Sequence, residues 1–470
     1  MKNNKEQKFS KNIFYAFTAQ SISLLVSVLT TLFVPRLLGV ESFGFWQLFV
    51  FYSSYVGFFH LGVNDGLYLR LGGEKYSELD HSLIGVQFKL LLLLQLIISA
   101  IIIIGSVFFV DDSNRLFVIV GTAIFLIITN LWGYLSLLLK AVNEIKSFSV
   151  SAIIDRMFFA IGVIGLIIAQ IDNLHYLVIF SILGRIFALI YCVSRCRQVI
   201  FCKKTSLKII INEFIINLKT GVILMLANIA NMVILGVGKL VIDNTWGIVI
   251  FGIVSFAITL TNFFFMFVGQ IGMVLFPTLR KMDESKLKST FANIRNLLGI
   301  FLPIIFLLYI PMSELLVLWL PSYAQSFRYL ILFLPLCIFD GKMKLLYTTY
   351  FKVMREEKKL LIINCIGTII SLVVSLIGAY VFRNLYVIIF GLLISIAIKS
   401  VIAELYLSRK MQNNTIRLLI QEFALVVIFV SATWFLSSIY SLIIVAISYL
   451  IHLFINRSLV NKYIVLESTL

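Results

Sequence analysis

Charged residues are scarce in this chain, and their scarcity excludes the commonest classes of protein. Only 13% of the 470 residues are charged and 61% are hydrophobic, whereas an ordinary soluble domain holds roughly 25% and 45–50%. These proportions exclude both a soluble globular protein and a disordered one. A helix that crosses a bilayer needs about 20 apolar residues. The composition therefore predicts a polytopic membrane protein with short loops.

The residues and motifs of common enzyme chemistry are also missing. The five Cys form no disulfide framework or metal-ligand pattern, and the four His are scattered. The chain has no phosphate-binding glycine loop, no G-x-S-x-G and no H-E-x-x-H sequence. An enzyme that acts on lipid-linked sugars would need a larger loop domain or an acidic metal site. We expect no enzymatic activity, no metal and no cofactor.

Fourteen apolar stretches are long enough to be transmembrane helices. They lie near residues 13–34, 43–63, 83–110, 116–139, 148–170, 174–195, 218–240, 246–274, 294–319, 327–352, 360–382, 386–407, 417–437 and 440–456. If the connecting segments alternate between the two sides, 28 of the 39 Lys and Arg fall on the side of the N-terminus and five on the other. Cytoplasmic loops carry such an excess. The sequence thus predicts an all-α protein of about 14 transmembrane helices with both termini in the cytoplasm. This topology accounts for the net charge of +17 without nucleic acid as a partner.

Short motifs recur at nearly one spacing, which indicates two related halves. Residues 140–146 read K-x3-E-x-K after the fourth stretch, and residues 352–358 repeat the pattern after the tenth. Arg185 and Lys399 take corresponding places in the sixth and twelfth stretches. We expect two pseudo-symmetric six-helix lobes around a central cavity. The predicted parts are an N-terminal lobe (1–195), a cytoplasmic basic and amphipathic linker (196–217), a C-terminal lobe (218–410), and two additional transmembrane helices with a tail (411–470).

Charged residues inside the predicted spans are candidate functional groups, because charge is costly in lipid. Lys89, Arg156, Arg185 and Lys399 have no acidic residue three or four positions away in their own helix. Arg185 lies near the middle of its helix, which favours a place facing the cavity. The other three lie about two turns from the inner surface, where a long basic side chain can also reach the headgroups. For these three, both interpretations stay open.

The tenth stretch contains three charged residues close together. Asp340 and Lys344 are spaced to pair on one helix, which leaves Lys342 over. Asp340 is the one acidic residue clearly placed at depth in the sequence. The interior is therefore predicted to hold an excess of positive charge. Such a cavity favours an anionic solute, and phosphate groups suit both Arg and Lys.

Polar side chains at helical spacing add candidate hydrogen-bonding groups. Gln20 begins such a series in the first stretch, Asn228 and Asn231 lie in the seventh, and Asn262 lies in the eighth. Amides at these places can hydrogen-bond a sugar. They can equally hold neighbouring helices together, and the sequence does not decide between the two roles.

A series of short motifs in a fixed order carries a family resemblance. These are Pro35-Arg36-Leu-Leu-Gly39 with Phe43-Gly44, Leu61-Gly62 with Asp65-Gly66 and Arg70, Lys140 to Lys146, Val274-Leu-Phe-Pro277-Thr-Leu, and Leu320-Pro-Ser-Tyr323. In this order the chain resembles the Wzx-type oligosaccharide flippases, in the polysaccharide-export branch of the MOP superfamily. The resemblance extends over most of the chain.

The resemblance implies an alternating-access transporter of the bacterial cytoplasmic membrane. It would turn an undecaprenyl-diphosphate-linked oligosaccharide to the outer leaflet for O-antigen or capsule synthesis, beside a polysaccharide polymerase and a chain-length regulator. A proton or Na⁺ gradient would drive it. The cavity cations that would bind substrate are Arg185, Lys399, Lys89 and Lys342, and the residues expected in gating or local structure are Arg36, Arg70 and Asp340.

Two other functions stay open. A MATE-like multidrug antiporter shares the fold, but it would need a buried acid to exchange a cation, and the predicted interior is positive. A polysaccharide polymerase would carry a large outer loop, which the chain lacks.

Overall fold

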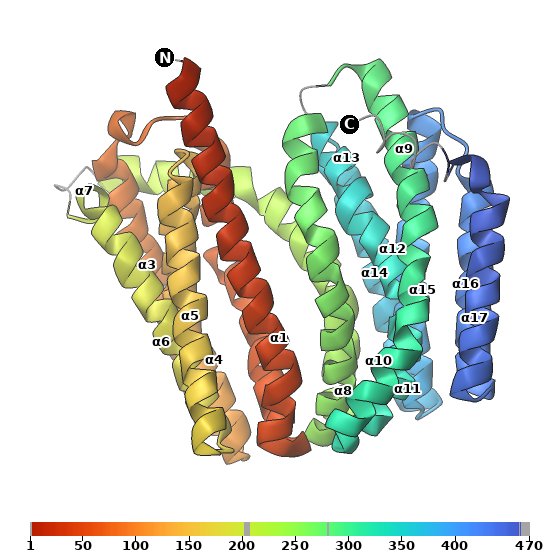
Figure 1. Ribbon diagram of the computed structural model, residues 1–470. Helices are drawn as coiled ribbons and strands as arrows, with labels where there is room; N and C mark the ends of the chain where they lie inside the picture. Colours follow the sequence, from red (N-terminus) through yellow and green to blue (C-terminus); the bar gives the residue numbers. More distant parts are fainter. Residues whose placement is uncertain (1, 202–206, 280–281, 460, 462–470) are drawn as a thin grey trace. The chain divides into compact units, whose positions relative to one another are not determined.

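The computed structural model describes residues 2–201, 207–279, 282–459 and 461, and the regular elements within these ranges are all helical. The chain forms two compact units, Met1–Ile229 (unit 1) and Ala230–Leu470 (unit 2) (Figure 1). Unit 1 contains α1 (Lys2–Tyr55), η1 (Val56–His60), α2 (Val63–Arg70), η2 (Tyr76–Glu78), α3 (His81–Phe109), α4 (Ser113–Ala141), α5 (Ile145–Ala169), α6 (Leu174–Arg195), α7 (Arg197–Ile200) and the start of α8 (Leu207–Leu279). Unit 2 contains the rest of α8, then α9 (Glu284–Phe301), η3 (Leu302–Ile304), α10 (Ile305–Trp319), η4 (Pro321–Tyr323), α11 (Ala324–Phe333), α12 (Leu336–Lys342), η5 (Met343–Tyr347), α13 (Thr348–Val353), α14 (Glu357–Leu376), η6 (Ile377–Val381), α15 (Leu385–Lys410), α16 (Ile416–Phe435) and α17 (Ser438–Ile455).

Eleven helical stretches in the described ranges are long and apolar enough to cross a membrane. Their outer faces carry large apolar side chains, such as Ile101 and Phe108 on α3 and Ile447 on α17. Such faces suit lipid, in which a helix satisfies its own backbone hydrogen bonds. The chain is therefore a multi-pass membrane protein.

The observed helices group the expected spans differently. The stretches Phe14–His60 and Met225–Phe265 each cover most of two expected spans. The expected helix over 327–352 is instead a run of short pieces from α11 to α13. Pro335 lies at one of its interruptions, where proline lacks the N–H that would continue a helix. The exact number of fourteen spans stays a prediction.

Each unit holds a long helix that breaks at a glycine. The breaks lie at Gly39 in α1 (φ 69°, ψ 176°) and at Gly247 in α8 (φ 78°, ψ −178°). Glycine adopts this backbone conformation at little cost, whereas other residues are strained there. Both glycines begin the sequence G-x3-F-G. The same local break therefore occurs once in each unit.

The recurring K-x3-E-x-K motif forms the same turn in both units. Asn143 and Arg355 adopt left-handed φ values of 61° and 56°. The next residues, Glu144 and Glu356, each donate the backbone N–H to the carbonyl five residues earlier, at 2.8 Å. Such left-handed turns end helices by satisfying their last carbonyls. The sequence repeat thus corresponds to a repeat of the backbone.

The start of α8 packs closely against α2 in unit 1. A Cβ atom on Gly66 would lie 1.9 Å from the carbonyl oxygen of Asn217, and one on Gly221 would lie 2.0 Å from that of Gly62. The two backbones can approach this closely only because these positions lack side chains. Part of the predicted linker is therefore packed into unit 1, although residues 202–206 lie outside the described ranges.

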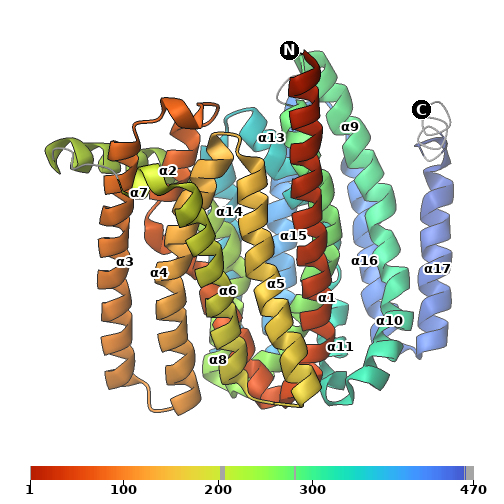
Figure 2. The same cartoon turned by 60° about the vertical axis from the view of Figure 1, so that its left-hand side comes forward.

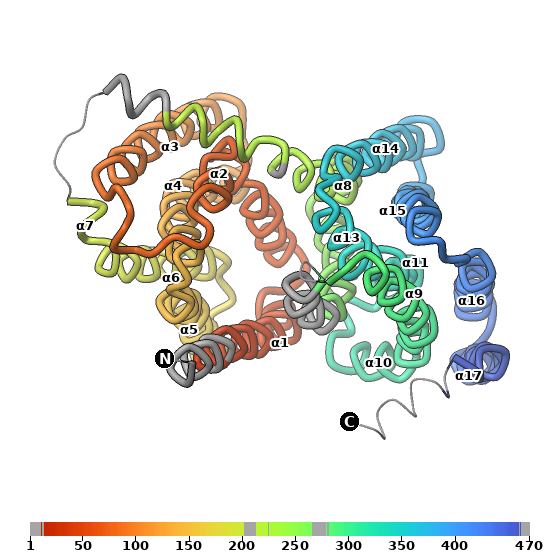
Figure 3. Tube along the Cα trace, turned by 90° about the horizontal axis from the view of Figure 1, so that it is seen from above, coloured from red at the N-terminus to blue at the C-terminus, as the bar shows by residue number. Residues whose placement is uncertain are grey.

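Unit 1 also contains a helix broken within its interior. The 3₁₀-helix η1 ends at Leu61–Gly62, and both residues are left-handed. The carbonyls of Val56 and Phe59 near the break accept hydrogen bonds from Asn130 Nδ2 and Gln95 Nε2, each at 2.9 Å. Amides of α3 and α4 therefore replace helical hydrogen bonds, as buried backbone groups require. The views in Figures 2 and 3 show α3 to α6 running alongside one another in this unit.

Candidate functional site

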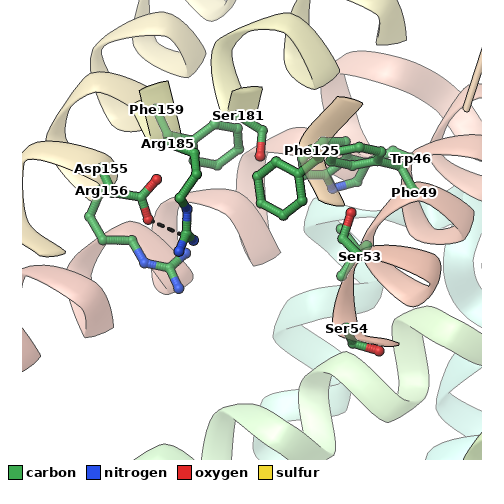
Figure 4. Close-up of a pocket in the computed structure, with 11 residues that line it drawn as sticks. Trp46, Phe49, Ser53, Ser54, Phe125, Asp155, Arg156, Phe159, Ser181 and Arg185 are labelled. Atoms are coloured by element: carbon green, nitrogen blue, oxygen red, sulfur yellow. Dashed lines mark ion pairs between the residues drawn. The ribbon is translucent and has the colours of Figure 1, made fainter. Parts of the chain in front are cut away.

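A pocket within unit 1 brings charged, hydroxyl and aromatic side chains together. Its volume is about 230 Å³, and helices α1, α4, α5 and α6 contribute to it (Figure 4). The lining residues are Trp46, Phe49, Val50, Ser53, Ser54, Phe125, Asp155, Arg156, Phe159, Ser181 and Arg185. The pocket therefore combines an apolar wall with two guanidinium groups and one carboxylate.

Arg185 is held in this pocket from three sides. Its Nη2 lies 3.0 Å from Oδ2 of Asp155, and the side chains are 13% and 11% exposed. Its guanidinium carbon lies 4.2 Å from the ring centre of Trp132 and 5.4 Å from that of Phe125. Aromatic faces attract a cation. Arg185 therefore lines a pocket within unit 1. The expectation that it faces a central cavity between the lobes and binds substrate stays a prediction.

Helices α5 and α6 approach one another closely beside this ion pair. A Cβ atom on Gly184, the residue before Arg185, would lie 2.7 Å from the carbonyl oxygen of Asp155. The glycine thus allows the backbone of α6 to reach the helix that carries the carboxylate. The short side chain of Asp155 can then contact the guanidinium directly.

The pocket retains unused hydrogen-bonding capacity. Among the described residues, Nε of Arg185 and Oγ of Ser53 are buried and have no hydrogen-bond partner. Arg156, next to Asp155 in the chain, is exposed and lines the same pocket. Two Arg and one Asp give these three groups a net charge of +1. Guanidinium and hydroxyl donors at these places can bind an oxyanion such as phosphate or carboxylate.

An aromatic stack forms the apolar wall. The ring of Trp46 stacks on Phe49 at 5.6 Å and on Phe159 at 5.7 Å, with interplanar angles of 28° and 12°. Trp46 is only 6% exposed. Rings packed in this way keep water from one side of the charged groups, and ion–dipole interactions are stronger where the dielectric constant is low.

A second ionic cluster lies in unit 2 around Asp340. Lys399 Nζ lies 3.1 Å from Asp340 Oδ1 and donates to Asn231 Oδ1 at 2.7 Å. Lys344 Nζ lies 2.8 Å from Asp340 Oδ2. The predicted Asp340–Lys344 pair is therefore confirmed. Three residues chosen separately from the sequence (Asp340, Lys399 and Asn231) meet in this cluster.

The two clusters use corresponding cations but different acids. Lys399 is the residue that the repeat aligns with Arg185, yet its acidic partner comes from α12 and not from α14. At the spacing of the K-x3-E-x-K repeat, the position that corresponds to Asp155 is Gly367. A Cβ atom there would lie 3.4 Å from the Cβ of Lys399. In unit 2 the absence of a side chain at Gly367 therefore gives space to the stem of the lysine.

The expectation that Lys342 is left without a partner is wrong. Its Nζ lies 2.8 Å from Glu404 and 2.5 Å from Glu422, and all three side chains are 0% exposed. Arg295 completes a buried quartet, with a nitrogen 2.5 Å from Glu404 and another 2.9 Å from Glu422. The hydroxyl of Tyr347 donates to Glu404 at 2.6 Å. Lys342 thus offers no surface to a solute in this structure.

The expectation that Asp340 is the one acid at depth is wrong for a related reason. Asp155, Glu404 and Glu422 are buried within apolar helices. Their partners in the structure lie on other helices. A search for acids three or four positions from each cation in the same helix therefore misses them. The adjacent Asp155-Arg156 pair was the available signal for the first of them.

The remaining predicted site residues are not gathered into either cluster. Lys89, Asn228 and Asn262 are exposed, and Gln20 is half-buried. No contact made by these four side chains carries a binding assignment, so their roles stay predictions.

The two arginines expected in gating or structure also have defined places. Arg70 lies at the end of α2, where its Nη2 is 2.7 Å from Glu213 and its Nη1 donates to Asn217 at 2.7 Å. It therefore fastens the start of α8 to α2. Arg36 is exposed and lies one residue after Pro35 and three before the break at Gly39.

Comparisons with known proteins relate the chain through its fold. No family model and no curated protein sequence matches it. Among solved structures, it is similar to the lipid II flippase MurJ in an inward closed conformation, with a TM-score of 0.61 and 15% identity over 96% of this chain and 99% of that one. It is equally similar to an inward-facing multidrug resistance MATE transporter of the MOP superfamily (TM-score 0.61, 12% identity, 84% and 94% covered). The chain is also similar to a MOP superfamily transporter from Pyrococcus furiosus, which is described as having a binding pocket of reversed polarity. The TM-score is 0.54, and the identity is 12% over 86% of this chain and 95% of that one.

The chain shares its fold with these solved transporters. At 12–15% identity the likeness concerns the fold alone, since one fold hosts many functions. These structural neighbours are transporters and flippases, not enzymes. The function of this chain therefore depends on its own side chains.

Proposed function

We propose that this protein is a flippase for oligosaccharide repeat units linked to undecaprenyl diphosphate in the bacterial cytoplasmic membrane. The observation that carries the proposal is the unit 1 pocket, in which Arg156 and Arg185 lie with one carboxylate beside an aromatic wall. Its net positive charge suits an anionic headgroup. The fold neighbour MurJ is a lipid II flippase, which makes a lipid-linked substrate compatible with this architecture.

The transport cycle follows from the chemistry of such a substrate. A diphosphate is attracted to the basic inner surface and exchanges water for guanidinium donors, first of the exposed Arg156 and then of Arg185. The glycan occupies polar space, and the lipid tail stays in the bilayer because its transfer to water is unfavourable. Alternating access then exposes the headgroup outside. A proton or Na⁺ gradient drives the cycle, and a polymerase and chain-length regulator use the product for surface polysaccharide.

A MATE-like antiporter for cationic drugs is the second candidate, because a MATE transporter has the same TM-score as MurJ. The charge of the pocket opposes it. Arg185 and Arg156 would repel a cation, and the carboxylate of Asp155 is already paired with Arg185. A drug cation would therefore gain little from this site.

The deciding experiment uses a cell that lacks the gene. Lipid-linked oligosaccharides are extracted, their accessibility to outside probes is measured, and surface glycan is blotted. We expect complete repeat units to accumulate on the lipid carrier, shielded from the outside, and surface polymer to be lost. Single repeat units exposed outside would instead indicate a polymerase, and unchanged pools would favour the antiporter.

A further inference from the structure

Asp155 occupies the same guanidinium that an incoming oxyanion would need. Its Oδ2 lies 3.0 Å from Nη2 of Arg185 in a pocket that four aromatic side chains help to line. In the described part of the chain, Nε of Arg185 retains no acceptor, although it is buried. The carboxylate thus neutralises Arg185 without using all of its donors.

Unit 2 maintains the same balance by a different route. Lys399 is paired with Asp340, although the position that corresponds to Asp155 is Gly367. Each of the two repeat-related cations therefore has an aspartate contact at about 3 Å. The acid comes from a different helix in each unit, so the contact between cation and carboxylate recurs even where the residue that supplies it does not.

We propose that Asp155 is an internal competitor, an anion of the protein that the transported oxyanion must displace from Arg185. This role of Asp155 rests on the proposed function only for the source of the oxyanion, which is the diphosphate or an acidic sugar. A buried guanidinium binds phosphate or carboxylate strongly when nothing opposes it. A transporter must also release its solute, and the carboxylate returns to Arg185 as the solute leaves. Asp155 thereby sets the affinity of the pocket.

The alternative role for Asp155 is to hold Arg185 in the correct orientation. The two roles predict opposite effects of removing the charge. If Asp155 competes, Asp155→Asn strengthens oxyanion binding, because Arg185 loses its internal partner. If Asp155 only orients the guanidinium, Asp155→Asn weakens binding.

The test is calorimetric titration of the purified full chain with inorganic pyrophosphate and, separately, with glucuronate. We expect Asp155→Asn to bind at least one probe tenfold or more tightly than the unaltered protein. Asp172→Asn is the matched control, since it removes the same charge from an exposed loop residue outside the pocket, and its affinity should not change. In Arg185→Gln the Asp155→Asn change should give no tightening, because the competitor then has no target.

The two probes distinguish the sources of the oxyanion. Tightening for pyrophosphate assigns the pocket to the diphosphate, and tightening for glucuronate alone assigns it to an acidic sugar. Equal or weaker binding of both probes in Asp155→Asn, or no binding at all, overturns the proposal. If the gene deletion leaves lipid-linked pools unchanged while Asp155→Asn still binds tenfold more tightly, flipping is refuted and the competing carboxylate stands.

A second measurement needs no neutral variant and so does not depend on whether Asp155→Asn folds. Infrared difference spectra are recorded on the unaltered protein, carrying carboxyl-labelled aspartate, with and without the probe that binds. Displacement from Arg185 should shift one labelled carboxylate band, and Asp155→Glu, which lacks that label, assigns it. A spectrum without this shift at saturating probe overturns the proposal.

Discussion

At the residue scale, the ionic clusters in the helices each bring charges of opposite sign together. Asp155 faces Arg185, Asp340 lies between Lys344 and Lys399, and two glutamates oppose Arg295 and Lys342. Each arrangement answers the same constraint, since an unpaired charge in a low-dielectric interior is costly. A charged group that still has exposed hydrogen-bond donors can bind a solute.

Arg185→Ala tests the cation of the pocket. We expect transport to fall about 10- to 100-fold, because hydrogen bonds to charged groups contribute roughly 1.5–3 kcal/mol and each 1.4 kcal/mol is a factor of ten. Arg185→Lys should recover only part of the activity, since an ammonium lacks the planar fork of donors. The measurement is surface glycan at matched membrane expression.

Arg197→Ala serves as its control, because Arg197 is exposed on α7 and lies outside the pocket. It should support normal transport. Full transport by Arg185→Ala at normal expression would remove Arg185 from the substrate path.

The sequence indicates the buried cations more clearly than it indicates their acidic partners. Arg185 and Lys399 were found because a basic residue in an apolar stretch is conspicuous by itself. Their acids were missed or misplaced because a contact between helices depends on how the helices pack, which spacing along one helix does not encode. Lys342 shows the result, since it was expected to be free and lies against Glu404 and Glu422.

At the element scale, two kinds of helix contact organise the units. One is the close backbone approach of α2 and the start of α8, and the other is the charged quartet that joins α9, α12, α15 and α16. The sequence predicted α16 and α17 as additional helices. The quartet and the hydrogen bond of Tyr449 on α17 to the carbonyl of Ile300, at 3.2 Å, attach them to the rest of unit 2.

Gly66→Ala tests the first contact. An added methyl group would meet the backbone of Asn217 at 1.9 Å, so α2 and α8 must separate. We expect a loss of about 1–3 kcal/mol in unfolding free energy, as for other overpacked positions, measured by thermal unfolding of the purified protein. Gly105→Ala is the control, since its Cβ would meet nothing within 4 Å and alanine favours a helix.

Glu422→Ala tests the second contact. It leaves Arg295 and Lys342 sharing one carboxylate in a site that is 0% exposed. Removing one partner of a buried ion pair typically costs about 3–5 kcal/mol, and we expect a loss of that size in the detergent-purified protein. The exposed Glu314 on α10 provides the matched change, Glu314→Ala. Equal melting of the two variants would contradict a structural role for the quartet.

Glu356 gives a pH-dependent contact at the turn before α14. Partial burial raises the pKa of this carboxyl, but hydrogen bonds from Lys410, at 2.6 Å, and Tyr406 outweigh burial and lower it below its usual 4.5. The contact therefore stabilises fully above pH 4.5 and is lost as the pH falls through the lower folded value. Glu356→Gln should lose this acid sensitivity, as followed by unfolding at pH 3 to 6.

At the scale of the whole molecule, composition and periodicity predicted the class of fold well. The apolar stretches and the repeated motif can be recognised without knowledge of packing. In the structure the apolar stretches form helices long enough to cross a membrane. The repeated motif forms matching left-handed turns at Asn143 and Arg355. The break at Gly39 falls in a gap between expected spans, whereas the break at Gly247 falls inside the expected span 246–274 and was not predicted. Short pieces such as α11 to α13 were not predicted, because a continuous helix and an interrupted one can have the same apolar sequence pattern.

Because the quartet is fully buried, the strength of its ion pairs should depend little on ionic strength. Mobile ions screen charges through the water around them, with a Debye length of about 3 Å at 1 M salt, and no side chain of the quartet reaches that water. An exposed pair such as Lys75–Glu78 weakens as salt is added, and so does attraction of the basic loops to anionic lipid. High salt can therefore release molecules that are bound to the surface of this protein by charge, while α16 stays attached to the rest of unit 2.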